Sequence, residues 1–237
     1  MARYECVRLS SDIANKSRII KFENALNQNL VDYLQENAWD DDTTSANAVY
    51  VVLDRNFDSE IVMYFALKSG MFSSPFSADI YEILDKLDQD VWDEMPANKV
   101  EALKYLKSFI EAAETNSEVN KVADTKPGVE LSQFCINLAY RKKMQDLGIN
   151  TKGIGAYIFH SEIYPIVQLV KEYVGCQFLY LFAADSSDNG TLIKYYRDML
   201  GFSTLDDYDR KLTDDKEVIP IMPYYDYQCK FMFMPLC

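Results

Sequence analysis

The sequence predicts an α/β fold in which a mixed, mostly antiparallel sheet is flanked by helices. Three observations support this prediction. Residues 48–54 and 60–68 are rich in β-branched and aromatic side chains and flank a polar turn. Residues 129–202 alternate between strand-like and helical patterns around a glycine-rich turn, and apolar residues recur at helical spacing between residues 12 and 37.

Composition indicates one soluble, cytoplasmic domain over residues 1–237. The chain is 49% hydrophobic, which is enough to bury a full core, and no stretch approaches twenty consecutive apolar residues. The N-terminus lacks the apolar segment of a secretory signal, so we expect no membrane association. Five scattered cysteines without a C-x-x-C pair and a single histidine, His160, argue against a disulfide framework and against a metal site.

The net charge of −13, from 37 acidic and 24 basic residues, indicates which kinds of partner the protein can attract. Nucleic acid is an unlikely partner by this measure, because a protein that contacts phosphates needs a basic face. An acidic surface suits a cationic substrate, which it attracts over long range. The simpler interpretation is that the acidity serves solubility alone.

The N-terminal part is expected to be helical and then to form a β-hairpin. A stripe of apolar residues from Ile19 to Leu34 predicts one or two helices. The acidic run Asp40 to Asp42 is expected to end them as a solvated loop. Residues 48–54 and 60–68 then pair as antiparallel strands.

Residues 72–127 are expected to form a helical insertion within the domain. Apolar residues line one face between Ile80 and Leu87 and again between Val100 and Ile110, and Pro96 stands where a second helix would begin. Such an insertion either shapes a substrate cleft or elaborates the structure.

The C-terminal half contains the remaining strands. A central strand begins at Val129, a helix follows Gly155 and ends near Gly175, and Pro165 should kink or break it. A buried strand is predicted at 177–184 and a helix thereafter. After an exposed acidic loop at 205–215, two closing strands are predicted at 218–222 and 227–234, the first an edge or bulged strand because of its prolines.

The turn at Gly153 and Gly155 is a candidate anion site. A strand followed by a glycine-rich turn that opens a helix directs backbone N–H groups toward one point, where the helix dipole also favours negative charge. A phosphate is the natural ligand. A purely structural turn is the alternative.

These residues resemble the signature of the GNAT superfamily of acyl-CoA-dependent N-acetyltransferases, Gln/Arg-x-x-Gly-x-Gly/Ala. That signature falls on residues 150–155, with Asn150 in place of the usual Gln or Arg. A second feature of the family, an Asn followed by Tyr and by Gly-Phe, falls on Asn189, Tyr196 and Gly201-Phe202. Residues 21–38 are also loosely similar to the subgroup that includes tRNA-acetylating toxins.

The resemblance implies a sheet with a splayed parallel strand pair and a binding site for acetyl-CoA as cosubstrate. It assigns the pyrophosphate to Lys152, Gly153, Ile154, Gly155 and Ala156. It assigns the pantetheine arm to the backbone of Phe134, Cys135 and Ile136. Asn189 is either a plain helix N-cap or a CoA contact that caps the helix as well. The basic cluster at residues 141–143 either meets the 3′-phosphate of CoA or lies in a solvated loop.

Two residues are the candidates for catalysis. Glu130, at the start of the central strand, is the candidate general base, on the same face as Ser132 and Phe134 unless a bulge intervenes. Tyr196 matches the family tyrosine that stabilises or protonates the departing thiolate, and Tyr195 competes with it from about 100° around the helix. The lack of a histidine placed to activate it argues against Cys135 as a nucleophile, and His160 fits packing or surface exposure.

The predicted function is transfer of an acetyl group from acetyl-CoA directly to a primary amine. The acceptor is an unidentified small molecule or protein. One alternative is a catalytically weak GNAT-fold module that binds CoA or a protein. The other is a toxin-like aminoacyl-tRNA acetyltransferase. The sequence leaves the oligomeric state open, with a homodimer among the options.

Overall fold

The structure is a computed structural model that describes residues 3–73, 125–185, 187, 189–204 and 229–236. The chain divides into two units, and these residues lie almost wholly in the unit made of residues 1–71, 126–216 and 224–237. The predicted insertion, the acidic stretch at 205–215 and the strand at 218–222 lie outside the described residues, apart from the ends of the insertion. The single-domain organisation therefore stays a prediction.

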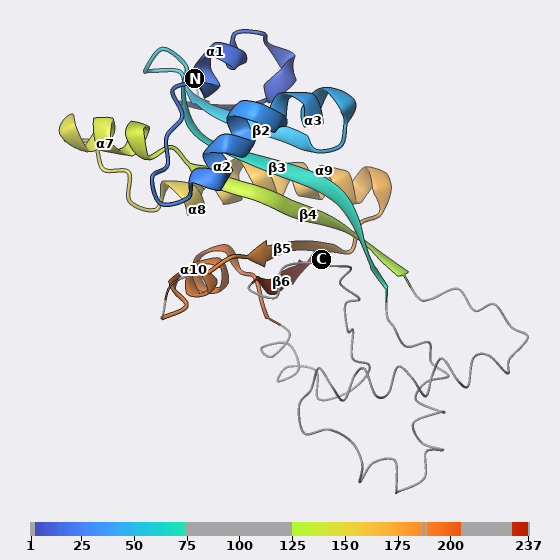
Figure 1. Cartoon of the computed structure of the whole chain (residues 1–237). Coiled ribbons are helices and arrows are strands. Elements are labelled where there is room, and N and C mark those ends of the chain that lie inside the picture. Colours follow the sequence, from blue (N-terminus) through green and yellow to red (C-terminus); the bar gives the residue numbers. More distant parts are fainter. Residues whose placement is uncertain (1–2, 74–124, 186, 188, 205–228, 237) are drawn as a thin grey trace, which may run out of the picture. The chain divides into compact units, whose positions relative to one another are not determined.

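One six-stranded sheet organises the described residues. Its strands stand in sequence order and are β1 (Tyr4–Arg8), β2 (Ala48–Asp54), β3 (Glu60–Ser73), β4 (Thr125–Ile136), β5 (Phe178–Ala183) and β6 (Lys230–Pro235). The pairs β1–β2, β2–β3 and β5–β6 are antiparallel, whereas β4 and β5 are parallel. The predicted mixed, mostly antiparallel sheet is confirmed (Figure 1).

The predicted hairpin is confirmed, with β2 at its predicted bounds and β3 longer than predicted. Its register runs from Ala48–Leu67 to Asp54–Glu60. Strand β1 was missed, because its five half-buried residues alternate too briefly to give a pattern.

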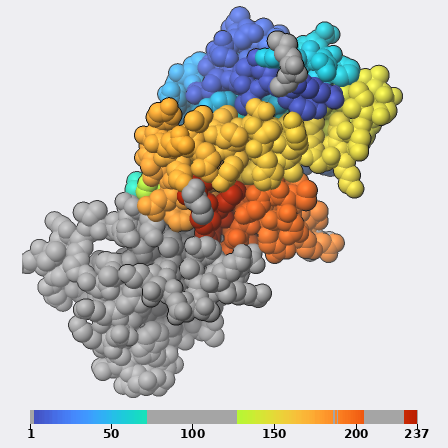
Figure 2. Space-filling view, turned by 180° about the vertical axis from the view of Figure 1, so that it is seen from behind, coloured from blue at the N-terminus to red at the C-terminus, as the bar shows by residue number. Residues whose placement is uncertain are grey.

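Helices cover both faces of the sheet. They are α1 (Asn15–Ile19), α2 (Gln28–Asp32), α3 (Ala38–Thr44), α7 (Leu138–Asp146), α8 (Ile154–Ile158), α9 (Tyr164–Val174) and α10 (Thr191–Leu200), with short η1 (Leu9–Ser11), η2 (Tyr33–Asn37) and η3 (Phe159–Ile163) segments. Helices α1 to α3 pack with one face of β2 and β3, and α7 to α10 pack with the opposite face. Figure 2 shows α8 and α9 crossing the second face, with α7 at one end.

The acidic run at residues 40–42 is not the predicted loop, and this prediction was wrong. The three residues belong to α3, and Asp42 is 3% exposed. Its carboxylate accepts hydrogen bonds from the Arg8 side chain and from the backbone N–H groups of Ser10 and Val49, at 2.7 to 2.8 Å. A buried carboxylate is stable where such partners converge, and they come from segments far from it in sequence.

The long helix after the glycine turn is interrupted before Pro165, as predicted. Helix α8 passes into the π-helical segment η3, and α9 then begins with Pro165 in its first turn. Proline lacks an N–H group, and the first turn is where that loss costs least. Gly175 ends the helix with φ 78°.

An ion pair with a buried carboxylate joins Arg3, just before β1, to Asp54 at the end of β2, and Tyr140 of α7 adds a hydrogen bond. Asp54 is fully buried, and its carboxylate accepts hydrogen bonds from Arg3 at 2.8 Å and from the Tyr140 hydroxyl at 2.6 Å. Burial acts to raise the pKa of Asp54, but the Arg3 and Tyr140 hydrogen bonds outweigh it and hold that pKa below 3.8. The ionised form is therefore the one that the fold favours.

We expect Asp54→Asn to lower the free energy of unfolding at pH 7 by about 2–3 kcal/mol, because Arg3 loses its charged partner. The pKa of Asp54 is depressed in the folded state, so its contribution is present above pH 3.8 and lost as pH falls through the folded pKa. Urea titrations of both proteins between pH 3 and pH 7 measure this. A difference in unfolding free energy between the two proteins that stays constant over that pH range would contradict this pH dependence.

Among the described residues no helix is long and apolar enough to span a bilayer. The same residues contain no group of three or more His, Cys, Asp or Glu side chains arranged to hold a metal ion.

Candidate functional site

The site is built around the point where β4 and β5 separate. Three residue pairs join the strands, and Glu130–Tyr180 is the last of them. Strand β4 continues to Ile136 and β5 to Ala183 without further pairs among the described residues, so the two strands splay toward their C-terminal ends (Figure 1). Such a splay leaves room for an extended ligand beside β4.

The side-chain alternation of β4 changes phase within the strand. Val129 and Leu131 pack in the same hydrophobic cluster as Phe134 and Ile136, whereas strict alternation would put the two pairs on opposite faces. A β-bulge produces such a change. The alternative that a bulge intervenes is therefore the correct one, and Glu130 does not share a face with Phe134.

Glu130 lies at the point of strand separation and is 5% exposed. Its Oε2 atom accepts a hydrogen bond from the Tyr180 hydroxyl at 3.3 Å. The prediction that Glu130 stands at the start of this strand was wrong, because β4 begins at Thr125 and Glu130 lies near its middle. A carboxylate with little exposure beside an open strand edge has the placement that a general base requires.

The end of β4 is contacted by a residue that sequence reasoning missed. Asn24 donates through Nδ2 to the Ile136 carbonyl at 3.1 Å and to the Cys135 sulfur at 3.2 Å. Burial raises the pKa of the Cys135 thiol to about 11, so the thiol stays protonated, in line with the argument against it as a nucleophile. The segment around Asn24 carried no pattern that marked this contact.

The glycine turn forms as predicted and opens a helix. Gly153 has φ 78° and precedes α8. The N–H groups of Gly153, Gly155 and Ala156 have no hydrogen-bond partner among the described residues. A Cβ atom on Gly155 would lie 2.7 Å from the Tyr195 hydroxyl oxygen and 2.9 Å from Ile136 Cδ1, so only glycine fits between them.

Two neighbours shape this turn. The Asn150 side chain accepts a hydrogen bond from the Lys152 N–H at 2.9 Å, which removes one donor from the predicted set and fixes the turn. Thr151 is 5% exposed, and its hydroxyl oxygen has no partner among the described residues. A buried hydroxyl without a partner, next to three free N–H groups, fits an anionic ligand at the turn.

Both candidate tyrosines lie on α10 near this region but in different surroundings. Tyr196 is 8% exposed, and its ring packs 6.4 Å from that of Phe134 and 6.2 Å from that of Phe202. Tyr195 is half-buried, with its hydroxyl against Gly155. Burial raises the pKa of both phenols, so both are proton donors at neutral pH.

Asn189 does not cap α10. The residue is exposed, and the cap position is Gly190. Asp185 accepts hydrogen bonds from the N–H groups of Leu192 and Ile193 at 2.8 and 3.0 Å, which satisfies the helix start. The capping by Asn189 that both alternatives assumed was therefore wrong, while its contact with CoA stays a prediction.

The basic cluster lies on α7, so the solvated-loop alternative was wrong. Lys143 pairs with Glu60 at 2.5 Å, and Lys142 is exposed. The Nε atom of Arg141 is buried without a partner among the described residues, and the Arg141 charge acts on Tyr195. His160 is exposed and lies 3.0 Å from the Met199 carbonyl, as expected for a surface histidine.

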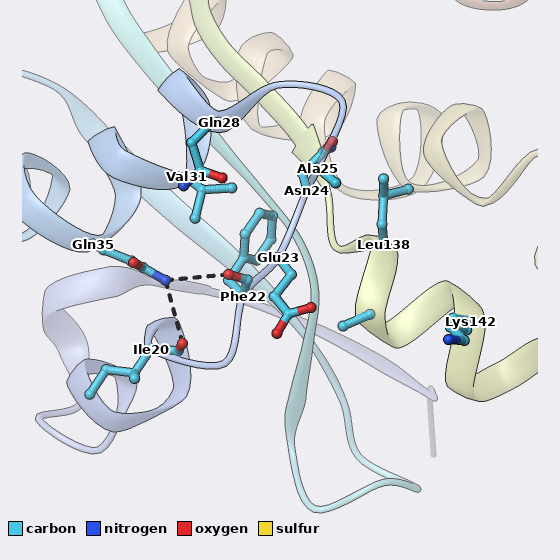
Figure 3. Close-up of a pocket in the computed structure, with 11 residues that line it drawn as sticks. Ile20, Phe22, Glu23, Asn24, Ala25, Gln28, Val31, Gln35, Leu138 and Lys142 are labelled. Atoms are coloured by element: carbon cyan, nitrogen blue, oxygen red, sulfur yellow. Dashed lines mark hydrogen bonds between the residues drawn. The ribbon is translucent and has the colours of Figure 1, made fainter.

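A cavity of about 440 Å³ lies beside the end of β4, on the side of α1 and α2 (Figure 3). Its wall is formed by Asn24 and its neighbours, by α2 and by the first turn of α7. The side chain of Gln35 braces the loop by donating to the carbonyls of Ile20 and Phe22 at 3.4 and 3.3 Å. Lys142 of the basic cluster lines this cavity, whereas Glu130, Tyr196 and the residues assigned to the pyrophosphate and the pantetheine arm do not.

Comparison with known proteins extends this description. No protein-family model matches the chain, and no curated protein matches its sequence. Solved structures do match in fold. A tyrosine-to-phenylalanine mutant of KacT has a TM-score of 0.52 at 13% identity, covering 99% of this chain and 95% of that one. AtaTR bound with AcCoA gives 0.54 at 14% identity and the same coverage. AtaT complexed with acetyl-methionyl-tRNAfMet gives 0.51 at 12% identity, covering 98% and 94%.

At 12% to 14% sequence identity, this similarity shows that the chain shares the fold of these structures. The splayed β4–β5 pair, the glycine turn that opens α8 and the position of α10 agree with that result. The chain therefore has the GNAT-like fold that its two motifs indicated.

Proposed function

We propose that this protein is an acetyltransferase that moves an acetyl group from acetyl-CoA directly to a primary amine. The observation that carries the proposal is the combination of a splayed strand pair with three free N–H groups at the glycine turn. The similar AtaTR structure bound with AcCoA supports it. Acetyl-CoA would supply an activated acyl group on a thiol that leaves readily.

Each part of the chain has a distinct role in this proposal. The N–H groups of Gly153, Gly155 and Ala156 bind the pyrophosphate, with charge added by Lys152, and the backbone at Phe134, Cys135 and Ile136 orients the pantetheine arm. Glu130 accepts a proton from the ammonium form of the acceptor, so that the amine nitrogen can attack the thioester carbon. As the carbon–sulfur bond breaks, a tyrosine hydroxyl on α10 protonates or stabilises the thiolate.

The free thiol and the transferred acetyl group provide the test. The protein would be mixed with acetyl-CoA and, separately, with spermidine, a lysine-containing peptide and methionyl-tRNA, and thiol release would be followed. Acetylation of at least one amine supports the proposal. Calorimetric binding of CoA without thiol release for any acceptor would instead favour the binding-module alternative.

The two tyrosines on α10 should differ in what they control. Tyr196→Phe is expected to lower kcat by about 10- to 100-fold with little change in CoA affinity, because it removes an acid near Phe134. Tyr195→Phe is expected to change the Kd for CoA instead, since its hydroxyl lies against Gly155. Steady-state kinetics and calorimetry on both variants distinguish the roles, and a kcat loss confined to Tyr195→Phe would reverse the assignment.

Aminoacyl-tRNA is a second candidate acceptor. One similar structure is a complex of AtaT with acetyl-methionyl-tRNAfMet. The expectation from net charge that nucleic acid is an unlikely partner is therefore not supported. The charge is also unevenly distributed along the sequence. Residues 74–124 and 205–228 carry most of the acidic excess, and the rest of the chain has nearly equal numbers of acidic and basic residues.

Salt dependence tests this candidate. If tRNA binds through phosphate contacts, the logarithm of its affinity should fall linearly with the logarithm of salt concentration between 50 and about 200 mM. Filter binding with charged and uncharged tRNA would measure it. A salt-independent affinity, or acetylation of free methionine equal to that of methionyl-tRNA, would exclude tRNA as the acceptor.

A further inference from the structure

Tyr180 crosses from β5 over β4 to reach Glu130 and Gly70. Glu130 and Tyr180 are paired in register, and paired residues of parallel strands project from the same face of a sheet. Leu179 and Leu181 pack in the cluster formed with α8 and α9, so Tyr180 projects from the opposite face. The two side chains are 5% and 6% exposed.

The ring of Tyr180 is held in place by aromatic neighbours. Its centroid lies 5.9 Å from that of Phe182, nearly perpendicular, and 6.0 Å from that of Phe231. Aromatic pairs at these separations are favourable and restrict the ring. Packing therefore fixes the Tyr180 side chain in one rotamer. In that rotamer its hydroxyl is already placed to donate to Glu130.

Gly70 on β3 makes this arrangement possible. A Cβ atom at Gly70 would lie 1.8 Å from the Tyr180 hydroxyl oxygen, 2.7 Å from Cζ and 3.0 Å from Cε1. The φ of Gly70 is not positive, so the backbone conformation does not demand glycine. A glycine inside a strand costs about 0.5–1 kcal/mol relative to alanine, and the close approach of the Tyr180 ring explains its presence here.

We propose that Tyr180 is a positioning residue for the Glu130 carboxylate and that Gly70 is required to admit it. The proposal rests on the proposed function, in which Glu130 is the general base. Tyr180 donates its hydroxyl hydrogen to Oε2 of Glu130, which fixes the plane of the carboxylate that takes the proton from the ammonium group. The Tyr180 proton itself is not transferred.

Three variants test the proposal: Tyr180→Phe, Gly70→Ala and the double variant. Tyr180→Phe should lower kcat/KM for the amine by about 10- to 100-fold, as expected for a misplaced catalytic group, and leave the Kd for CoA unchanged. Gly70→Ala should give the same changes by displacing the ring.

The Glu130→Gln background separates positioning from a structural role. There, Tyr180→Phe should cause little further loss of activity, whereas a structural defect would add to the loss. Tyr64→Phe is the matched control, since Tyr64 is buried on the same sheet and donates to the Leu30 carbonyl at 2.6 Å rather than to Glu130. It should lower Tm without the loss of kcat/KM expected for Tyr180→Phe.

Stability measurements test the Gly70–Tyr180 contact without reference to catalysis. In a double-mutant cycle of unfolding free energies, Gly70→Ala should cost less in the Tyr180→Phe background, because the nearest clashing atom is gone. Strict additivity would overturn the role of Gly70. An unchanged kcat/KM for the amine in Tyr180→Phe would overturn the role of Tyr180. If Glu130→Gln retains full activity, the proposed function of Glu130 itself fails, which is a separate outcome.

Discussion

Glu130→Gln is expected to lower kcat for amine acetylation by about 10²- to 10⁴-fold at neutral pH, the range that a general base contributes. Glutamine keeps the shape of the side chain and can still accept the Tyr180 hydrogen bond, but it cannot take a proton. The loss should therefore appear in kcat, with the Kd for CoA unchanged by calorimetry.

A control variant and a measurement at higher pH accompany this experiment. Glu162→Gln changes a carboxylate on η3, away from the point where β4 and β5 separate, and should leave kcat unchanged. Raising the pH should partly rescue Glu130→Gln, because a larger fraction of the acceptor amine is then already neutral. Retention of more than about a third of wild-type kcat would contradict the role of Glu130 as the base.

Gly155→Val is expected to weaken CoA binding by about 100-fold. The valine side chain would displace the Tyr195 hydroxyl and Ile136, whose atoms lie closest to a Cβ atom at position 155. Hydrogen bonds to charged groups contribute about 1.5–3 kcal/mol each, so the loss of one or two from the turn gives a change of this size. Calorimetry with CoA measures it, and Tm distinguishes weakened binding from unfolding.

Gly148→Asn is the matched control, because Gly148 lies outside the residues assigned to the pyrophosphate. Gly148 has φ 72°, and a Cβ atom there would have no neighbour within 4 Å. Asparagine tolerates this backbone conformation better than most other residues. Its Kd for CoA should stay within about threefold of the wild type. A loss equal to that of Gly155→Val would contradict the role of the close approach at Gly155.

The strands and the glycine turn were predictable because their signals are local. The β-branched residues of 48–54 gave the bounds of β2, and the apolar run at 177–184 gave those of β5 within a residue or two. Gly153 and Gly175 marked a helix start and a helix end by their backbone freedom. The motif residues near Gly155 and Tyr196 were found in the same way, from short spacings.

Errors arose where contacts between distant segments decide the structure. Asp42 was assigned to a loop because acidic runs are usually solvated, and its partners Arg8 and Val49 lie on other elements. Asp185 was overlooked because nothing local indicated that its carboxylate would take the α10 N–H groups that Asn189 was expected to meet.

The sequence by itself determined strands β2 and β5, the helix that follows the glycine turn and the turn itself, because dihedral preferences and apolar spacing act within a few residues. Only the tertiary structure decided that Tyr180 meets Glu130 across Gly70, that Tyr195 rather than Tyr196 lies against Gly155, and that Asn24 reaches the end of β4. These contacts depend on strand order, on the β4 phase change and on close packing between elements. None of those quantities is encoded in the spacing of residues along one segment.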